Sequence, residues 1–294
     1  LHTHSDASFL IDPDAQSKLR QGCTLELNGN CGISRCAPLV GMARDQAEEH
    51  WESYGLDPRL ITWTTFEEYL NRLELAGSSI NQAAQVGHGT VRTAVMGFED
   101  RAPTSSELDA MKTLVAEALD AGALGFSTGL YYAPGSYART DEVAELAREA
   151  SSRDKLYSSH IRDESNYSVS LFNAIEEAIA IGRQSGVRVQ ISHLKCLGRP
   201  TWGRAQDLLD RIARSREEGL DVASDQYPYT ATSTGLSGAI FPRWSQVGGR
   251  DVLIKNLSDK AFRMRLHEGI KENLDRRGSA EHIVIARYVP NPEF

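Results

Sequence analysis

Residues 167–195 read YSVSLFNAIEEAIAIGRQSGVRVQISHLK, a helix pattern followed at once by a strand pattern. Apolar residues recur every three or four positions between residues 167 and 185, which predicts an amphipathic helix over that range. Val187, Val189 and Ile191 then alternate with other residues, which predicts a strand that ends near His193. A helix that leads directly into a strand is the unit from which parallel sheets are built.

The same unit repeats along most of the chain. Thr104 and Glu107 form a capping-box pattern that predicts the start of a helix, and Gly122 ends that helix. Further helices are predicted from Thr140 and over residues 202–219. The predicted strand ends number seven and lie in residues 1–4, 24–30, 80–87, 123–128, 155–160, 187–193 and 220–225.

Five side chains that bind metal ions stand at or just after these strand ends. His2 and His4 alternate in the first predicted strand, so both point to one face, about 7 Å apart along the chain. Cys31, His160 and His193 each follow a later strand. A single histidine or cysteine is more often structural, but imidazole and thiolate together are typical zinc ligands. The five residues therefore predict one tight zinc site and part of a second.

The placement of these ligands bears on the architecture. An open doubly wound sheet usually keeps its ligand chemistry near one switch point, whereas here the candidates follow four different strands, as the C-terminal face of a barrel allows. We therefore predict an α/β fold, a (β/α)8 TIM-type barrel of which strands 1–7 are present. No remaining segment of the sequence fits an eighth strand.

Two segments interrupt the repeat. Residues 32–63 are expected to form a long loop that covers the mouth of the site. We predict that residues 1–227 form the partial barrel and that residues 228–294 form a lid or insertion subdomain after strand 7. In that subdomain the sequence predicts an amphipathic helix near residues 260–275 and a short strand at 282–287.

Composition excludes several classes of protein. The chain has 294 residues and a net charge of −8, which argues against nucleic acid or an anionic membrane as a partner. No apolar run approaches the ~18 residues of a membrane span. The four cysteines contain no Cys-x-x-Cys pair, which favours a reducing, cytoplasmic setting. Because the chain starts without Met and ends within a loop-like sequence, we expect it to be an internal portion of a longer protein.

Seven motifs together resemble one family. In chain order they are HTHSD from residue 2, NGNCG from 28, VGHGT from 86, STGL from 127, HIRDE from 160, ISHLK from 191 and DQYPY from 225. This order resembles that of the N-acyl-D-amino-acid deacylases (D-aminoacylases) of the amidohydrolase superfamily. The resemblance implies a (β/α)8 barrel beside a small β-sandwich built from both chain ends, so that this chain lacks the eighth strand and the sandwich.

The resemblance also implies roles for the candidate metal ligands. Cys31, His160 and His193 match the tight zinc site of the family. His2 and His4 match a weaker second site that shares Cys31.

Other positions match substrate contacts of the family. Lys195 and Tyr227 match residues that hold the substrate carboxylate, and Ser233 matches a further polar contact. Tyr131 matches an aromatic residue that lines the side-chain pocket, and Tyr132 is an equal candidate for its rim.

Several nearby polar residues have open interpretations. Arg162, Asp163 and Glu164 either orient a zinc ligand or form a structural ion pair or solvated loop. We expect His88 to serve a turn between glycines. The remaining histidines are expected at the surface, namely His50, His267 and His282.

The catalytic general base is the main departure from the family. The resemblance places this aspartate after the eighth strand, so we expect it beyond Phe294, and Asp225 matches a different position. The sequence thus predicts a zinc-dependent hydrolase of the small-molecule N-acyl-D-amino acids. The alternatives are a related enzyme for another amide (a cyclic amide, an N-acyl-amino sugar or a dipeptide) and a non-catalytic metal-binding fragment.

Overall fold

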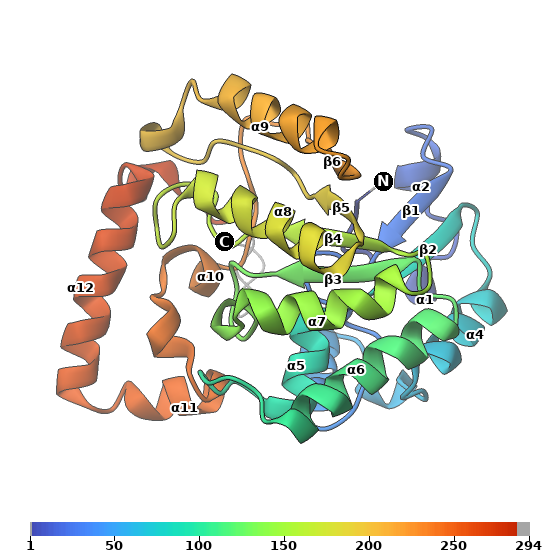
Figure 1. Cartoon of the computed structure of the whole chain (residues 1–294). Helices are drawn as coiled ribbons and strands as arrows, with labels where there is room; N and C mark the ends of the chain where they lie inside the picture. The colour runs from blue at the N-terminus through green and yellow to red at the C-terminus, as the bar shows by residue number, and fades with distance from the viewer. Residues whose placement is uncertain (1, 287–294) are drawn as a thin grey trace.

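A single parallel sheet organises the protein (Figure 1), and the computed structural model describes residues 2–286. Its six strands pair in the order in which they occur in the chain, each parallel to the next. The strands are β1 (Leu25–Asn28), β2 (Asn81–Gly87), β3 (Gly125–Gly129), β4 (Leu156–His160), β5 (Arg188–Ile191) and β6 (Val222–Ser224).

Helices connect the successive strands, as a parallel sheet requires. The α-helices are α1 (Ser8–Ile11), α2 (Gln16–Leu19), α3 (Met42–Ser53), α4 (Phe66–Ala76), α5 (His88–Met96), α6 (Ser105–Asp120), α7 (Thr140–Ser151), α8 (Leu171–Ser185), α9 (Ala205–Glu217), α10 (Leu236–Ile240), α11 (Gly249–Asn256) and α12 (Lys260–Arg277). Short 3-10 helices occupy Pro58–Leu60, Gly135–Tyr137, Arg199–Thr201, Arg243–Gln246 and Ala280–His282. None of the helices in residues 2–286 has the length and apolar character needed to span a bilayer.

The predicted barrel architecture is confirmed as a half-barrel. Six of the seven predicted strands are present, whereas the first is reduced to one parallel bridge between His2 and Leu27. The sheet is strongly curved, because the rings of His2, beside β1, and His193, after β5, have centroids only 5.2 Å apart. Five strand spacings in a flat sheet would separate such positions by about 24 Å.

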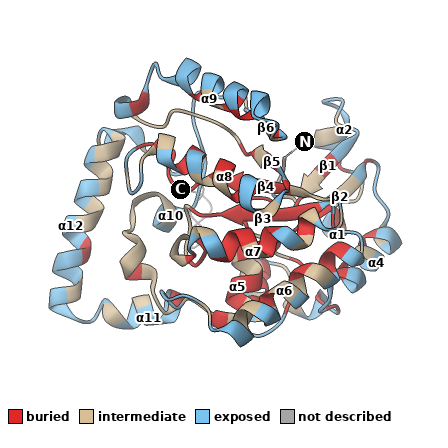
Figure 2. Ribbon diagram, in the orientation of Figure 1, coloured by how far each residue is buried: buried red, intermediate tan, exposed pale blue. Residues whose placement is uncertain are grey.

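The core lies between the sheet and the outer helices (Figure 2). All five residues of β3 are buried, and Phe126 stacks on Tyr157 of β4 with ring centroids 6.0 Å apart. Helix α6 begins with the predicted capping box, in which the Thr104 side chain accepts from the backbone N–H of Glu107. Its buried face consists of Met111, Val115, Ala118 and Leu119, at the spacing of an amphipathic helix.

The prediction of a long loop over residues 32–63 is wrong in part. Residues 42–53 form α3, which buries Ala43, Ala47 and Trp51 at intervals of four residues. Arg44 anchors this helix by donating to the carbonyl oxygens of Ile61 (2.8 Å) and Trp63 (3.0 Å). The small alanine side chains give only a weak apolar pattern in the sequence, so tertiary packing rather than pattern defines this helix.

The segment after β6 is helical where described. The helix predicted near residues 260–275 is confirmed as α12, although only Leu266 of that helix is buried. The predicted strand at 282–287 is wrong for residues 282–286, because His282 ends a 3-10 helix and residues 283–286 form no strand. Residue 287 lies outside the described residues. The division of the chain between residues 227 and 228 stays a prediction.

Candidate metal centre

Cys31 occupies a turn directly after β1. Its backbone φ is +56°, in the left-handed region that non-glycine residues rarely adopt. The end of β3 presses against this turn, because a Cβ on Gly129 would overlap the carbonyl oxygen of Cys31. Close backbone packing thus holds the thiol in place.

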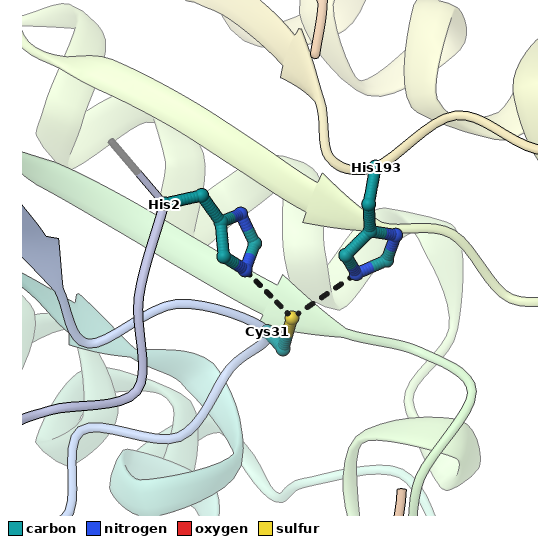
Figure 3. A group of neighbouring side chains, drawn as sticks. All are labelled: His2, Cys31 and His193. Atoms are coloured by element: carbon teal, nitrogen blue, oxygen red, sulfur yellow. Dashed lines mark hydrogen bonds between the residues drawn. The ribbon is translucent and has the colours of Figure 1, made fainter. Parts of the chain in front are cut away.

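Two imidazoles flank the thiol (Figure 3). The Sγ atom of Cys31 lies 3.6 Å from Nε2 of His2 and 3.4 Å from Nε2 of His193. These residues come from the N-terminal segment and from the turn after β5, so three segments distant in sequence meet at one sulfur atom.

His160 extends this group at the end of β4. Its ring centroid lies 4.4 Å from that of His193. The side chain is buried, yet neither ring nitrogen has a hydrogen-bond partner, which is costly unless another group binds there. Burial also lowers the pKa of His160 well below its usual value, so the ring is neutral, as a metal ligand must be.

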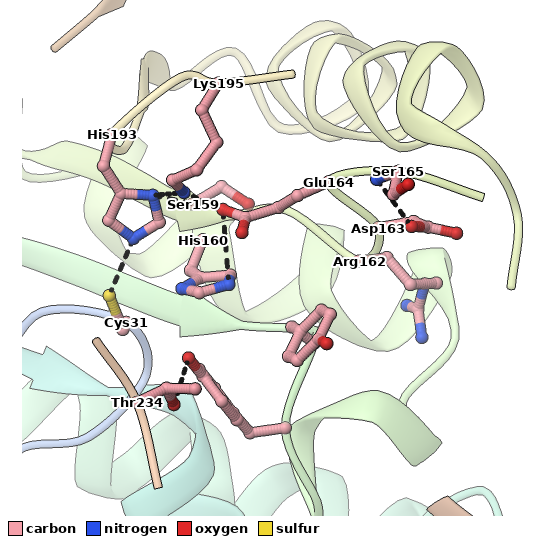
Figure 4. Close-up of polar contacts among 12 residues, drawn as sticks. Cys31, Ser159, His160, Arg162, Asp163, Glu164, Ser165, His193, Lys195 and Thr234 are labelled. Carbon is pink, nitrogen blue, oxygen red and sulfur yellow. Dashed lines mark hydrogen bonds and ion pairs between the residues drawn. The ribbon is translucent and has the colours of Figure 1, made fainter. Parts of the chain in front are cut away.

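Glu164 joins the two histidines through its carboxylate (Figure 4). Its Oε1 lies 3.6 Å from Nε2 of His160 and 3.2 Å from Nδ1 of His193. Burial alone would raise the pKa of this carboxyl, but His160, His193 and Lys195 together hold it below the usual range. Glu164 is therefore an anion, and of the two imidazoles only His193 is close enough to donate to it.

The ligand atoms fall into two overlapping groups among the described residues. One contains His2, Cys31 and His193, the other His160, Glu164 and His193, and the atoms of each lie within 4.8 Å of one another. The expected tight set of Cys31, His160 and His193 is therefore not one compact group. Cys31 and His160 fall in different groups, and only His193 belongs to both. His4 is exposed and belongs to neither, although its ring centroid lies 5.4 Å from that of His2.

The donor set fits a zinc ion. Burial, with Glu164 as a further cause, raises the pKa of the Cys31 thiol far above its usual value in the metal-free protein. Burial and the neighbouring His193 lower the pKa of His2 to about 4. A neutral thiol and neutral imidazoles in a dry site are what a zinc ion converts into ligands when it displaces the thiol proton.

Asp225 fixes the backbone that carries His193. The φ of His193 is +39°, a strained value, and its backbone N–H donates to Oδ1 of Asp225 at 2.6 Å. Oδ2 of the same carboxylate accepts from the side chain of Gln190 at 2.8 Å. The carboxylate of Asp225 thus positions a ligand-bearing turn.

The predicted carboxylate-binding residues lie beside this group. Lys195 forms an ion pair with Glu164, and its ammonium lies 2.9 Å from Nδ1 of His193 and 5.5 Å from the ring centre of Tyr227. The hydroxyl of Tyr227 is buried without a partner. A substrate carboxylate could therefore accept a hydrogen bond from the Tyr227 hydroxyl. It would compete with the Glu164 carboxylate for the Lys195 ammonium.

The two tyrosines after β3 both reach His160. Ring centroids are 5.6 Å from His160 for Tyr131 and 4.8 Å for Tyr132. The Tyr131 hydroxyl accepts from Arg277 at 2.9 Å, and the Tyr132 hydroxyl lies 3.0 Å from Oγ1 of Thr234.

The predicted contact Ser233 is exposed, so its neighbour Thr234 is the residue that approaches the aromatic pair. Sequence reasoning missed Arg277 and Thr234. The motif beginning at Asp225 pointed to the right segment for Thr234, whereas nothing in the sequence singled out Arg277.

The HIRDE motif divides into separate roles. Arg162 pairs with Glu177 (2.7 Å) and donates to two backbone carbonyls, and Asp163 accepts from three backbone amides in residues 165–170. Both are structural, which leaves Glu164 as the member of the trio that contacts the candidate ligands.

His88 is not a turn residue, contrary to expectation. It begins α5, is fully buried, and its Nε2 lies 3.0 Å from Oε1 of Glu142. The same carboxylate oxygen accepts from Nε of Arg92 at 3.1 Å. The glycines beside His88 serve close packing against the Cys31 turn, since Cβ atoms there would clash with Gly32.

Sequence comparison places the chain among enzymes of one kind. It is 40% identical over 236 residues to an N-acyl-D-aspartate deacylase and 40% identical over 237 residues to a D-aminoacylase, both from Alcaligenes xylosoxydans xylosoxydans. Each alignment covers 80% of this chain but 46% and 47% of those proteins, so the chain spans about half the length of the curated relatives it matches. No protein-family model matches it.

Solved structures give the same grouping. A D-aminoacylase described as defining a subset of amidohydrolases aligns with a TM-score of 0.70 and 36% identity, over 79% of this chain and 47% of that one. An N-acyl-D-glutamate deacylase from Bordetella bronchiseptica, complexed with zinc and a phosphonate mimic of the tetrahedral intermediate, aligns with a TM-score of 0.66 and 39% identity, over 78% and 46%.

The fold and the donor set therefore define part of an amidohydrolase barrel. Over the residues that align, the chain is similar to N-acyl-D-amino-acid deacylases, or D-aminoacylases.

Proposed function

We propose that this chain is the metal-binding part of a zinc-dependent hydrolase that cleaves the amide bond of N-acyl-D-amino acids, releasing a carboxylate and a D-amino acid. The observation that carries the proposal is the Cys31 thiol, which lies between the imidazoles of His2 and His193 at the strand ends. The identity to deacylases of N-acyl-D-aspartate and N-acyl-D-glutamate supports the substrate class.

In this proposal His2, His4, Cys31, His160 and His193 are the metal ligands, with His4 the most peripheral because it is exposed. A bound zinc ion supplies a water molecule of lowered pKa and polarises the acyl carbonyl. Glu164 accepts the Nδ1–H of His193, which frees Nε2 for the metal and fixes the ring.

Substrate orientation falls to residues on the β5 and β6 side. Lys195 and Tyr227 hold the single carboxylate of an N-acyl amino acid, which is a charge-assisted contact for the ammonium. Tyr131 lines the space for the amino-acid side chain, and Ser233 is the weakest of the proposed contacts because it is exposed. The aspartate that transfers the proton is expected after Phe294.

The test combines metal content with enantiomer preference. We expect the purified chain to bind stoichiometric zinc and to bind N-acetyl-D-amino acids more tightly than the L enantiomers. Hydrolysis of the D form is the activity readout for a version of the protein that includes the expected aspartate. A chain that binds no zinc would contradict the ligand assignment, and equal affinity for both enantiomers would contradict D specificity. Zinc and D-ligand binding without turnover in a version of the protein that includes the expected aspartate would favour the non-catalytic alternative.

We also propose a cytoplasmic location. The four cysteines are all free, and the thiol of Cys31 must stay reduced to bind metal. Reporter fractionation of the tagged protein tests this location, and recovery outside the cytoplasm would contradict it.

A further inference from the structure

A cavity of about 780 Å³ borders Cys31 and has no role in the arrangement described above. Its walls come from α3, from the first turns of α5, and from the segment 129–135 that follows β3. These elements succeed β1, β2 and β3, whereas Lys195 and Tyr227 succeed β5 and β6. The candidate metal centre therefore lies between the cavity and the proposed carboxylate contacts.

The cavity has an apolar wall interspersed with polar side chains, among them Arg35, Thr90 and Thr93, and it carries charges at its rim. Ile33, Phe98, Tyr132 and Pro134 contribute apolar wall. Glu49 and Arg250 stand at the rim, both largely exposed, with 3.8 Å between Oε2 and Nη1. An apolar group that enters the cavity can pack against the apolar part of this wall.

We propose that this cavity receives the acyl group of the substrate. The protein then prefers straight apolar acyl groups of about four to eight carbons, which fit the space present, to acetyl. The inference rests on the proposed function, because it takes the amide at the candidate metal centre as its origin. In an N-acyl amino acid the acyl carbon and the carboxylate lie on opposite sides of the amide nitrogen. With the carboxylate at Lys195 and Tyr227, the acyl group extends past Cys31 toward β1–β3, where the cavity lies.

Size supports an acyl group longer than acetyl. A methyl group needs about the volume of a water molecule, ~30 Å³, which is a small fraction of 780 Å³. Each methylene buried in an apolar site strengthens binding about fourfold. Longer acyl groups should therefore bind more tightly until the rim charges of Glu49 and Arg250 are reached.

The experiment measures binding rather than turnover. Methyl-, propyl- and pentylsulfonyl-D-alanine carry the carboxylate and a sulfonamide that replaces the hydrolysable amide. Calorimetric titration of these compounds into the zinc-loaded full chain should show at least about tenfold tighter binding of the pentyl than of the methyl compound. Replacing D-alanine by D-leucine in the methyl compound tests whether the cavity takes the amino-acid side chain instead.

A matched pair of variants locates the effect. Gln46→Trp narrows the cavity from an exposed position on α3, and Asp45→Trp places the same ring on an exposed neighbouring position outside the cavity wall. We expect Gln46→Trp to weaken the pentyl compound at least about tenfold and to leave the methyl compound unchanged. Asp45→Trp should change neither, and unfolding midpoints and zinc content should match wild type in both variants.

Three results would overturn the inference. Equal affinities across the sulfonyl series would remove the acyl preference while the deacylase proposal stood. Equal weakening of both compounds by Gln46→Trp, or a response to the D-leucine side chain alone, would assign the cavity another role. Failure of every compound to bind the zinc-loaded chain would overturn the proposed function together with this inference.

Discussion

At the scale of single residues, the backbone of two candidate ligands stands out. Cys31 and His193 both have positive φ values, +56° and +39°. Such conformations in non-glycine residues cost on the order of 1–3 kcal/mol each and persist only where the surroundings hold them. Gly129 packs on the Cys31 carbonyl, and Asp225 binds the His193 amide. The strain turns both side chains toward one point, which fits a metal-binding role.

Replacement of the thiol tests that role. Cys31→Ser keeps the size of the side chain but removes the soft donor, so zinc affinity should fall by more than about 100-fold. Competition with a chromophoric chelator measures this change. Cys23→Ser, at a partly exposed cysteine just before β1, is the control and should keep wild-type affinity. Unchanged affinity in Cys31→Ser would remove Cys31 from the ligand set.

Buried histidines also predict how the metal-free protein responds to acid. Burial lowers the pKa of His160 well below 6.5, and burial with His193 lowers that of His2 to about 4. Unfolded imidazoles titrate near 6.5. Below pH 6.5, and until the folded-state pKa is reached, the unfolded chain therefore binds more protons. The free energy of unfolding must fall as pH falls through this window.

Urea unfolding of His160→Gln isolates the contribution of the His160 imidazole. The free energy of unfolding is measured at about pH 6.5, 5.5 and 4.5, which spans the window. We expect its free energy of unfolding to fall less steeply with acid than that of wild type. Burial raises the pKa of Asp6 to about 6, which acts in the opposite direction, but this contribution is common to both proteins. His267→Gln, on the exposed side of α12, should keep the wild-type slope. An identical slope in His160→Gln would contradict the prediction.

Much of the site was predictable at this scale because metal ligands follow strand ends, and strand ends are visible in a sequence. His2, Cys31, His160 and His193 do gather at the end of the sheet where the strands finish. The grouping of the ligands was not predictable, since it depends on sheet curvature and on side-chain rotamers. Glu164 illustrates the limit, because the sequence left its role open and only its distances to two imidazoles separate it from Arg162 and Asp163.

At the scale of elements, the end of β3 sets the position of the Cys31 turn. Gly129→Ala would place a Cβ atom against the carbonyl oxygen of Cys31. Because neither atom can rotate away from the other, the backbone of the Cys31 turn must move. We expect zinc affinity to fall by about 10–100-fold although Gly129 contributes no ligand. Gly235→Ala is the matched control, because its φ is not positive and its Cβ would meet no atom within 4 Å. Wild-type zinc affinity in Gly129→Ala would show that the turn adapts.

Elements with strong periodicity were predictable and those defined by packing were not. The capping box of α6 and the face of α8 follow from local sequence, and both helices form, although α8 begins at Leu171, four residues later than predicted. Helix α3 packs through two alanines and one tryptophan, a pattern too weak to identify beforehand. The strand expected at 282–287 failed because an apolar run alone does not supply a pairing partner in the described residues.

At the scale of the whole molecule, the candidate ligands join distant parts of the sheet. His2 bridges to β1, at one edge, while His193 follows β5, next to the other edge. Within the described residues no strand continues the sheet beyond β6, whose last two residues are exposed. The centre of the sheet is different, since β3 is buried throughout. Stability should therefore be highest at β3 and lowest at the two edges.

Zinc should act on this gradient as a cross-link between the edges. A ligand that binds only the folded state stabilises the parts that open when it leaves, and here these are the segments that carry His2 and His193. We expect added zinc to slow amide hydrogen exchange in residues 2–4, 25–31 and 188–194. Exchange in β3 should slow as well where it needs global unfolding, because global unfolding also releases the ion. Helix α12 should serve as an internal control for local opening because it lies apart from the ligands. The Cys31→Ser protein should lose the zinc-dependent slowing at both edges together. Slowing confined to one edge would mean that the ion does not join His2 to His193, and the two histidines would then belong to separate sites.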